Sequence, residues 1–127
     1  MSRQRRRDTA AEMSLRRELH RQGFRYRVNL PVPGLPRRRA DLTFARQKLA
    51  VFVDGCFWHG CPEHATLPKR NSTWWKMKLQ RNCERDRETD RHLITLGWRV
   101  LRVWEHEPPE VAAERVRNAL IEGELDP

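Results

Sequence analysis

The sequence predicts an α/β fold in which a small mixed sheet is flanked by helices. Two observations lead to this class. Apolar residues recur at helical spacing in three segments, and four shorter segments are rich in β-branched and aromatic residues. In chain order they predict a helix, three strands, a helix, a strand and a helix. A length of 127 residues suits one compact domain, which we assign to residues 8–127, behind a basic flexible arm of residues 1–7.

Residues 8–23 predict the first helix. Thr9 and Glu12 have the spacing of a capping box, and Gly23 is a residue type that often ends a helix. The positions predicted to face inward are Ala11, Leu15 and Leu19. Their spacing of four residues sets them on one face of the helix.

Three strands follow, and the last of them is the most apolar. Residues 24–30 alternate apolar and basic side chains, residues 31–39 predict a turn-rich loop, and residues 40–47 predict a second short strand. Residues 48–55 carry the longest apolar run, so we expect this strand at the centre of the sheet.

The second half of the chain predicts a long helix, a strand and a final helix. A loop rich in His, Cys, Pro and Gly runs to about Lys69, and the long helix begins near Ser72. Residues 98–104 predict a strand, and residues 109–123 predict the last helix. The predicted inward positions of the two helices are Leu79, Cys83, Leu93 and Leu96, and then Val111 or Ala112, Val116, Ala119 and Leu120.

The protein is strongly basic, with a formal net charge of +9. Residues 1–41 hold 12 Lys and Arg against 4 Asp and Glu, whereas residues 105–127 hold 2 against 7. A basic body with an acidic tail favours a polyanionic partner, above all nucleic acid, over an inert basic surface. We expect the clustered Arg37, Arg38 and Arg39 to contact DNA phosphates.

No apolar segment of the sequence is long enough for the core of a signal peptide or for a membrane span. The sequence therefore predicts a soluble, intracellular protein with no membrane partner. Its three cysteines are an odd number for a disulfide framework. In a reducing compartment they suit metal binding with one spare thiol.

Metal-binding side chains gather directly after the apolar strand, within VFVDGCFWHGCPEH. Cys56, Cys61 and His64 have spacings that suit tetrahedral zinc, and four protein ligands would make that zinc structural. One strand ends just before Cys56 and another ends just before His106. If these two strands are parallel neighbours, His106 is the fourth ligand. The alternative is Cys83, which the helical pattern predicts to be a buried thiol instead.

Two aspartates stand at predicted strand ends. Asp41 begins one strand and Asp54 ends the next, so a hairpin would bring both carboxylates together to bind a hard cation such as magnesium. In a basic protein this cation would meet a phosphodiester. Taken singly, each aspartate is also explained as a turn residue. The nearby His59 either joins the zinc ligands or serves as a general acid–base group.

Two aromatic pairs, Phe57–Trp58 and Trp74–Trp75, stand in polar surroundings. Packing within the loop is the ordinary explanation for such residues. The alternative is stacking on DNA bases or insertion between them, and the neighbouring carboxylates favour that alternative.

Three motifs, FVDGCFWHGCPEH, WWKMKLQRNCERDR and LGWRVLRVWEHE, resemble the very-short-patch-repair (Vsr) mismatch endonucleases over residues 8–107. The resemblance implies a restriction-endonuclease-like fold of the PD-(D/E)xK type, with a structural zinc site. It also implies magnesium-dependent nicking of double-stranded DNA beside a T:G mismatch, which deamination of 5-methylcytosine produces. The expected setting is a monomer in the bacterial cytoplasm, associated with the nucleoid and linked in function to a cytosine methyltransferase and mismatch-repair proteins.

The resemblance also implies roles for single residues. Asp41 corresponds to the metal-binding aspartate, His59 to the catalytic histidine and Glu12 to a glutamate near the active site. Asp54 would add a second magnesium carboxylate from the adjacent strand. The aromatics that wedge into DNA correspond to Phe57, Trp58 and Trp75, and the zinc ligands correspond to Cys56, Cys61, His64 and His106.

Two other hypotheses fit the sequence. One is a restriction-like or defence nuclease that cuts without a mismatch. The other is a non-catalytic, zinc-stabilised DNA-binding module whose acidic residues are structural. Cleavage of matched and T:G duplexes, with and without magnesium, separates all three.

Overall fold

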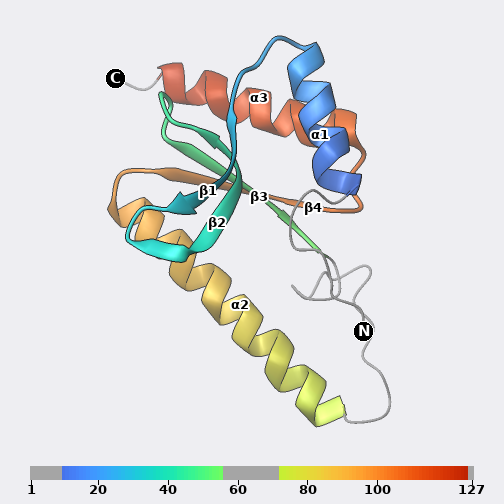
Figure 1. The fold of residues 1–127 in the computed structure, drawn as a ribbon, viewed down its shortest axis with the longest axis vertical. Helices are drawn as coiled ribbons and strands as arrows, with labels where there is room; N and C mark the ends of the chain where they lie inside the picture. The colour runs from blue at the N-terminus through green and yellow to red at the C-terminus, as the bar shows by residue number, and fades with distance from the viewer. Residues whose placement is uncertain (1–9, 56–71, 126–127) are drawn as a thin grey trace.

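The computed structural model describes residues 10–55 and 72–125 (Figure 1). Within these residues the elements are α1 (Ala10–Arg21), β1 (Arg27–Val32), β2 (Leu35–Phe44), β3 (Leu49–Asp54), α2 (Ser72–Thr95), β4 (Arg99–Trp104) and α3 (Pro109–Leu125). The predicted order of a helix, three strands, a helix, a strand and a helix is confirmed. The predicted basic arm, residues 1–7, lies outside the described residues.

The described strands form one mixed sheet in the order β1-β2-β3-β4. The first two pairings are antiparallel, and β3 and β4 run parallel. The apolar strand β3 therefore lies inside the sheet, as its composition predicts. The parallel register sets Asp54 opposite Trp104, so both strands end at the same edge. This confirms the parallel neighbours on which the choice of His106 depends.

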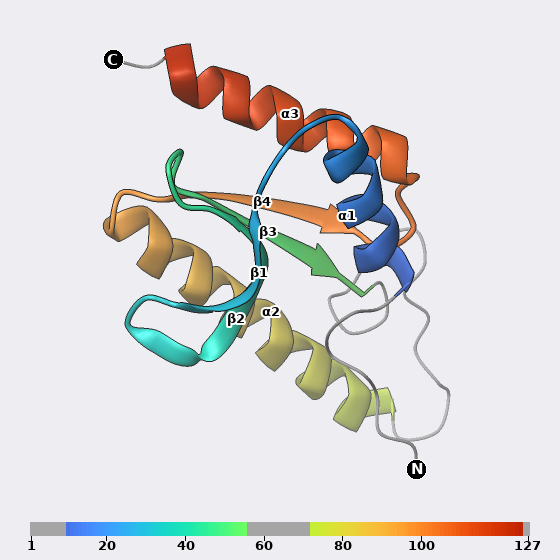
Figure 2. The ribbon, with the colours of Figure 1, turned by 45° about the horizontal axis from the view of Figure 1, so that its top comes forward.

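Helices cover both faces of the sheet. Figures 1 and 2 show α1 and α3 together on one face and α2 alone on the other. The larger core lies under α1 and α3, and its buried residues are Leu15, Leu19, Leu42, Phe44, Leu49, Val51, Val103, Ala112, Ala113, Val116 and Leu120. The smaller core lies under α2 and consists of Val32, Ala40, Ala50, Phe52 and Leu93. Alternate residues of β3 thus serve different cores, as the two-residue period of a strand requires.

The predicted loop over residues 31–39 is wrong. β1 continues to Val32 and β2 begins at Leu35, so the turn contains only Pro33 and Gly34. Gly34 has a φ of 84°, which suits the third position of a type II turn after proline. The prolines misled the prediction because β1 is an edge strand, where a missing N–H is tolerated. The three arginines therefore lie on a strand.

Asp41 lies within β2 and does not begin a strand, contrary to the prediction. Ala40 packs in the smaller core, whereas Leu42 packs in the larger one. Residues two apart share a face on a regular strand, so β2 must twist sharply around Asp41. Asn29, which the β1–β2 register sets opposite Asp41, has a φ of 54°. The first part of β2 thus packs against α2, and the second part packs under α1 and α3.

The long helix α2 begins at Ser72, as predicted, and packs on the sheet mainly through its C-terminal half (Figures 1 and 2). Leu93 is buried, but Leu96 is 45% exposed, so its predicted inward position is wrong. The helix ends at Thr95, so Leu96 does not continue its buried face. Gly97, with a φ of 89°, then turns the chain away from the helix axis. In α3, Ala112 faces inward and Val111 is exposed. None of the helices in the described part of the chain is long and apolar enough to cross a membrane.

Candidate functional site

Asp41 joins β2 to the end of β3 through its side chain. The backbone N–H of Val53 donates a hydrogen bond to Oδ2 of Asp41 at 2.7 Å. Residue pairing between β2 and β3 stops at Leu42 and Val51, so the carboxylate replaces the backbone partner that a longer ladder would supply. The twist of β2 therefore points Asp41 at the carboxyl end of the central strand.

Glu12 approaches Asp41 from the first turn of α1. Its side chain is 4% exposed and is hydrogen-bonded to the carboxyl group of Asp41. Nη2 of Arg16 lies 3.5 Å from Oε1 of Glu12, one helical turn further along. The other half of the predicted capping box, Thr9, lies outside the described residues. Within them, Glu12 is a buried partner of Asp41.

Burial raises the pKa of Asp41 to about 7, and the negative charges of Glu12 and Asp54 add to this rise. The hydrogen bond from Val53 acts in the opposite direction, because it stabilises the charged form. At such a pKa, Asp41 is partly protonated near neutral pH. A bound cation would relieve the same accumulation of negative charge.

Asp54 is the last residue of β3 and is 6% exposed. Nη1 of Arg102 donates to both of its carboxylate oxygens, at 2.9 and 3.1 Å. Arg102 also binds Asp90 of α2, with Nη2 at 2.8 Å from Oδ1. Burial lowers the pKa of Arg102, but its contacts with Asp90, Asp54 and Asp86 outweigh burial and raise it. Sequence reasoning did not identify Arg102, although an arginine on the inward face of an apolar strand was the signal.

The donor set at this sheet edge fits a hard divalent cation. Within residues 10–55 and 72–125, no three His, Cys, Asp or Glu side chains are arranged to hold a metal ion by themselves. Magnesium, however, commonly takes only one or two protein carboxylates together with water and substrate phosphates. Asp41 is the member of the group that lacks a described arginine or lysine partner, since Glu12 contacts Arg16 and Asp54 contacts Arg102. It is therefore the carboxylate best able to bind such a cation.

Three predicted zinc ligands, Cys56, Cys61 and His64, and the predicted catalytic His59 lie outside the described residues. The fourth zinc ligand, His106, is described and half-buried. The backbone N–H of Glu105 donates to the carbonyl of Asp54 at 2.9 Å, so the chain leaving β4 runs beside the chain leaving β3. The rival ligand Cys83 is half-buried on α2.

An aromatic and basic surface covers the start of α2. Trp74 and Trp75 meet edge to face with ring centroids 4.6 Å apart, and Nζ of Lys78 lies 5.7 Å from the Trp74 ring. Trp74 is 54% exposed and Met77 is 49% exposed, whereas Trp75 is half-buried. Phe57 and Trp58, the other predicted aromatic pair, lie outside the described residues.

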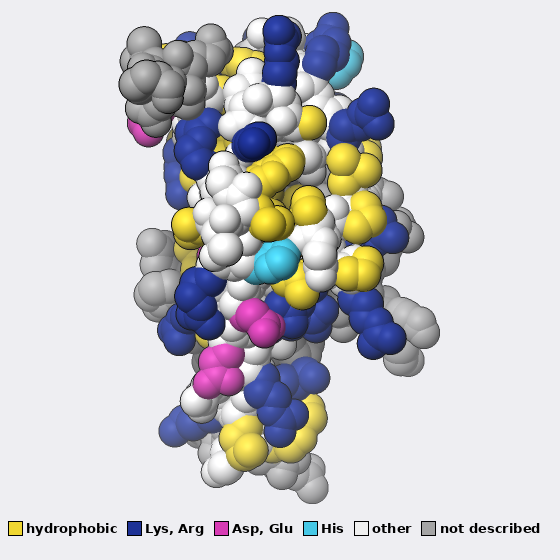
Figure 3. Space-filling model, turned by 90° about the vertical axis from the view of Figure 1, so that its left-hand side faces the viewer, with side chains coloured by type: hydrophobic (Ala, Val, Ile, Leu, Met, Phe, Trp, Pro, Cys, Tyr) yellow, Lys and Arg dark blue, Asp and Glu magenta, His cyan; other side chains and the backbone are white. Residues whose placement is uncertain are grey.

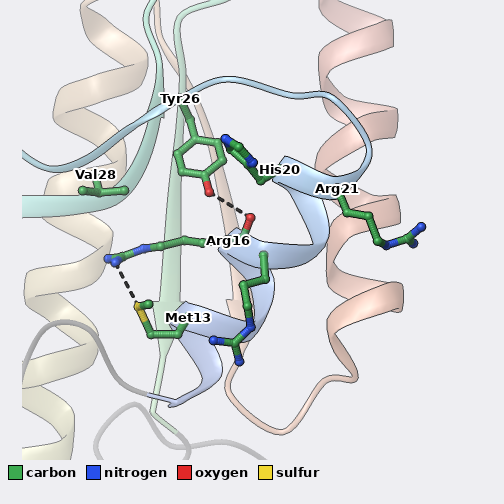
Figure 4. Close-up of a pocket in the computed structure, with 7 residues that line it drawn as sticks. Met13, Arg16, His20, Arg21, Tyr26 and Val28 are labelled. Atoms are coloured by element: carbon green, nitrogen blue, oxygen red, sulfur yellow. Dashed lines mark hydrogen bonds between the residues drawn. The ribbon is translucent and has the colours of Figure 1, made fainter.

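A basic groove of about 590 Å³ runs along α1 and β1 (Figure 4). The side chains that line it are Met13, Arg16, Arg17, His20, Arg21, Tyr26 and Val28. The Tyr26 hydroxyl donates a hydrogen bond to the carbonyl of Arg16 at 2.8 Å and so links its ring to α1. Arg21 points away from Tyr26 and pairs with Glu18, but the exposed Arg17 has no ion pair with any described residue (Figure 4). Sequence reasoning did not identify this groove, because its walls come from two separate elements.

The three arginines of β2 differ in their contacts. Arg38 pairs with Glu88 at 2.8 Å and donates to Thr89 at 3.0 Å, so it anchors β2 on α2. Arg39 donates to the carbonyl of Asn29 at 2.7 Å but remains exposed, and Arg37 is also exposed. Figure 3 shows Lys and Arg side chains spread over the whole of one face of the molecule. Such a surface suits a polyanion.

Asp41 should make the stability of the fold depend on pH. Its pKa of about 7 in the folded chain lies above 3.8, the ordinary pKa of an aspartate in an unfolded chain. Between these values the folded chain holds a proton that the unfolded chain has released, so stability falls as pH rises through this window. Without divalent cations, the free energy of unfolding of Asp41→Asn should exceed that of the parent by about 1–3 kcal/mol at pH 8 and should equal it near pH 4. Urea denaturation at both pH values measures the difference.

A matched control is Glu114→Gln, which neutralises an exposed carboxylate on α3. It should change stability little at either pH. If Asp41→Asn altered stability equally at pH 4 and pH 8, burial would not be the origin of the effect.

Comparison with known proteins identifies the family. The family described as DNA mismatch endonuclease Vsr matches residues 1–64. The type II nicking enzyme V.NaeI of Lentzea aerocolonigenes is 44% identical over 122 residues, which cover 94% of this chain and 74% of that protein. The type II nicking enzyme V.XorIIP of Xanthomonas oryzae pv. oryzae is 37% identical over 125 residues, with coverage of 94% and 88%. The DNA mismatch endonuclease Vsr of Escherichia coli is 40% identical over 103 residues, with coverage of 78% and 62%. Both the matched family and the extent of these alignments show that the chain belongs to the Vsr family of DNA mismatch endonucleases.

Proposed function

We propose that the protein is a magnesium-dependent endonuclease that nicks one strand of DNA beside a T:G mismatch. The observation that carries this proposal is the meeting of Glu12, Asp41 and Asp54 at one sheet edge of a chain with net charge +9. A basic surface attracts the DNA backbone, and the buried carboxylates supply the local negative charge that a divalent cation requires. The names of the relatives, nicking enzyme and mismatch endonuclease, support single-strand cleavage at a mismatch.

Asp41 is the proposed direct ligand of the cation, and Glu12 lies against it. Bound magnesium would polarise the scissile phosphate and lower the pKa of an attacking water. The hydrogen bond from Val53 holds Asp41 in a fixed orientation before the cation arrives. His59 follows β3 closely in the chain, and we assign it the transfer of a proton to or from the reacting oxygen atoms.

Mismatch selection is proposed to depend on aromatic side chains. A T:G pair stacks less well than a matched pair, so opening the neighbouring step costs less free energy. Phe57, Trp58 and Trp75 would stack in the opened step, and the exposed Trp74 would support Trp75 through their edge-to-face contact. Each stacked base contributes about 1–3 kcal/mol to binding.

We propose a structural zinc ion bound by Cys56, Cys61, His64 and His106. Two described features support this ligand set: β3 and β4 are parallel, and Glu105 lies beside Asp54. When bound, zinc would fix the polar segment after β3 against the end of β4.

Asp41→Asn should abolish magnesium-dependent nicking and leave DNA affinity almost unchanged, because the charge that it removes is negative. The assay measures nicking of labelled duplexes, either matched or with one T:G pair, with and without magnesium. His59→Ala should lower the rate by about 10²–10⁴-fold, as expected for loss of an acid–base group. Full activity of Asp41→Asn, or activity without any divalent cation, would refute this mechanism. Equal nicking of matched duplexes would instead favour a nuclease without mismatch dependence.

Arg17→Ala should weaken DNA binding equally for matched and mismatched duplexes. Loss of one phosphate contact should also reduce the slope of log affinity against log salt by about 1. Arg117→Ala is the matched control, since it removes the same charge from an exposed position on α3. Fluorescence anisotropy at several salt concentrations measures both variants. Equal losses of DNA affinity in the two variants would mean that binding depends on the net charge of the protein and not on the groove.

The purified chain should contain about one zinc per molecule by elemental analysis, and chelation should lower its thermal stability. Replacing Cys56 and Cys61 by serine should abolish zinc binding. Cys83→Ser, which changes a half-buried thiol on α2, should retain it. A Cys83→Ser protein without zinc would identify Cys83 as the ligand in place of His106.

A further inference from the structure

Arg102 links three elements through one guanidinium group. From its position on β4, Nη1 donates to both oxygens of Asp54 on β3, at 2.9 and 3.1 Å. On α2, the carboxylate of Asp90 accepts hydrogen bonds from Nε at 3.0 Å and from Nη2 at 2.8 Å. Asp86 contributes its carbonyl at 3.4 Å and a carboxylate oxygen at 3.7 Å. One cation therefore holds three carboxylates, one of which belongs to the candidate active site.

The sheet register explains why this contact forms. Arg102 lies opposite Phe52 in the parallel pair, and its guanidinium lies 4.3 Å from the centre of the Phe52 ring. Asp54 lies two residues further along β3 and shares that face of the sheet. The ring supports the planar guanidinium from β3, while Asp86 and Asp90 approach from α2. The Arg102 side chain is only 20% exposed, so its contacts are poorly screened by water.

We propose that Arg102 is a positioning residue that keeps Asp54 out of direct contact with the catalytic cation and leaves Asp41 as the direct ligand. This inference rests on the proposed function. A magnesium ion needs oxygen atoms at about 2.0–2.1 Å in nearly octahedral order. Both oxygens of Asp54 already accept hydrogen bonds from a guanidinium, and a second cation on them would be repelled by the first.

Asp54 still acts on the site from this position. Its negative charge lies close enough to Asp41 for the two groups to interact through space. Arg102 carries one positive charge and its three aspartates carry three negative charges, which leaves a net formal charge of −2. The cluster therefore attracts a cation toward Asp41 without binding it directly. Glu12, with Arg16 at 3.5 Å, is the corresponding neighbour on the other side.

Manganese binding to the full-length protein without DNA tests this assignment. Manganese takes the same oxygen ligands as magnesium, and electron paramagnetic resonance measures the free ion directly. Asp41→Asn should weaken binding more than about 10-fold, whereas Asp54→Asn should weaken it less than about threefold. Arg102→Gln should tighten binding by about 5- to 10-fold, because Asp54 then becomes a direct ligand. The double variant Arg102→Gln/Asp54→Asn should lose this gain.

Measurements of the nicking rate and of stability distinguish a positioning role of Arg102 from a merely structural one. Arg102→Gln should bind manganese more tightly and yet nick more slowly at saturating magnesium, since the cation would move toward Asp54. A structural role alone would lower stability and leave the manganese affinity unchanged. Arg102→Lys keeps the charge but cannot bind two carboxylates in the same way, so a smaller gain is expected from this better-folding variant.

The outcomes also separate this inference from the proposed function. If Asp54→Asn weakens manganese binding as much as Asp41→Asn in a protein that nicks, Asp54 is a direct ligand and the role of Arg102 is refuted. An unchanged affinity in both Arg102→Gln and Arg102→Lys refutes it as well. A parent protein that neither binds manganese nor nicks DNA refutes the proposed function itself.

Discussion

The parallel pairing of β3 with β4 is the constraint on which the candidate site depends. Six residue pairs, from Leu49–Arg99 to Asp54–Trp104, fix the register of the two strands. Because parallel strands end at the same edge, the chain leaves both of them side by side. Parallel neighbours also require a crossover, and α2 lies within it, on the face opposite α1 and α3 (Figure 2). The crossover brings the aspartates of α2 to Arg102.

The distribution of acidic groups explains why a basic chain offers a candidate cation site. Glu12 and Asp54 are the buried carboxylates among the described residues, and each contacts an arginine. Asp41 contacts Glu12 and accepts a hydrogen bond from a backbone amide, and it has no arginine or lysine partner among the described residues. A hydrogen bond from an amide stabilises a carboxylate less than a neighbouring guanidinium does. Asp41 is therefore the carboxylate whose charge is least compensated by the described residues, which is why we propose it as the direct ligand of a divalent cation.

Helix α1 connects the proposed DNA-binding groove with the proposed catalytic carboxylates. Glu12 lies in its first turn, and Arg16 and Arg17 lie one turn further along, at the basic groove. A helical turn advances about 5.4 Å, so the groove begins close to the carboxylates. Leu15 and Leu19 are buried on the other face of the same helix. A single amphipathic helix thus fixes the distance between the basic groove, where we propose that DNA binds, and the proposed cleavage site.

Local patterns in the sequence predict the order of the elements, the interior position of β3 and most of the buried helical positions. These properties follow from local periodicity, because a helix or strand buries one face whatever its partner is. The motifs also identified the family before any geometry was known. Local patterns failed at residues 31–39, where prolines and arginines suggested a loop but cross-strand hydrogen bonds to β1 maintain a strand.

The way in which the charged groups combine depends on the packed fold. Glu12 belongs to a helix and Asp41 to a strand, and 28 residues separate them in the chain, yet they share a hydrogen bond. The sequence suggested a capping role for Glu12 because that role requires only nearby residues. Asp54 could be read as an available ligand because its partner Arg102 is 48 residues away. Such contacts depend on strand register and helix crossover, so their physical origin is the packed fold and no local pattern records them.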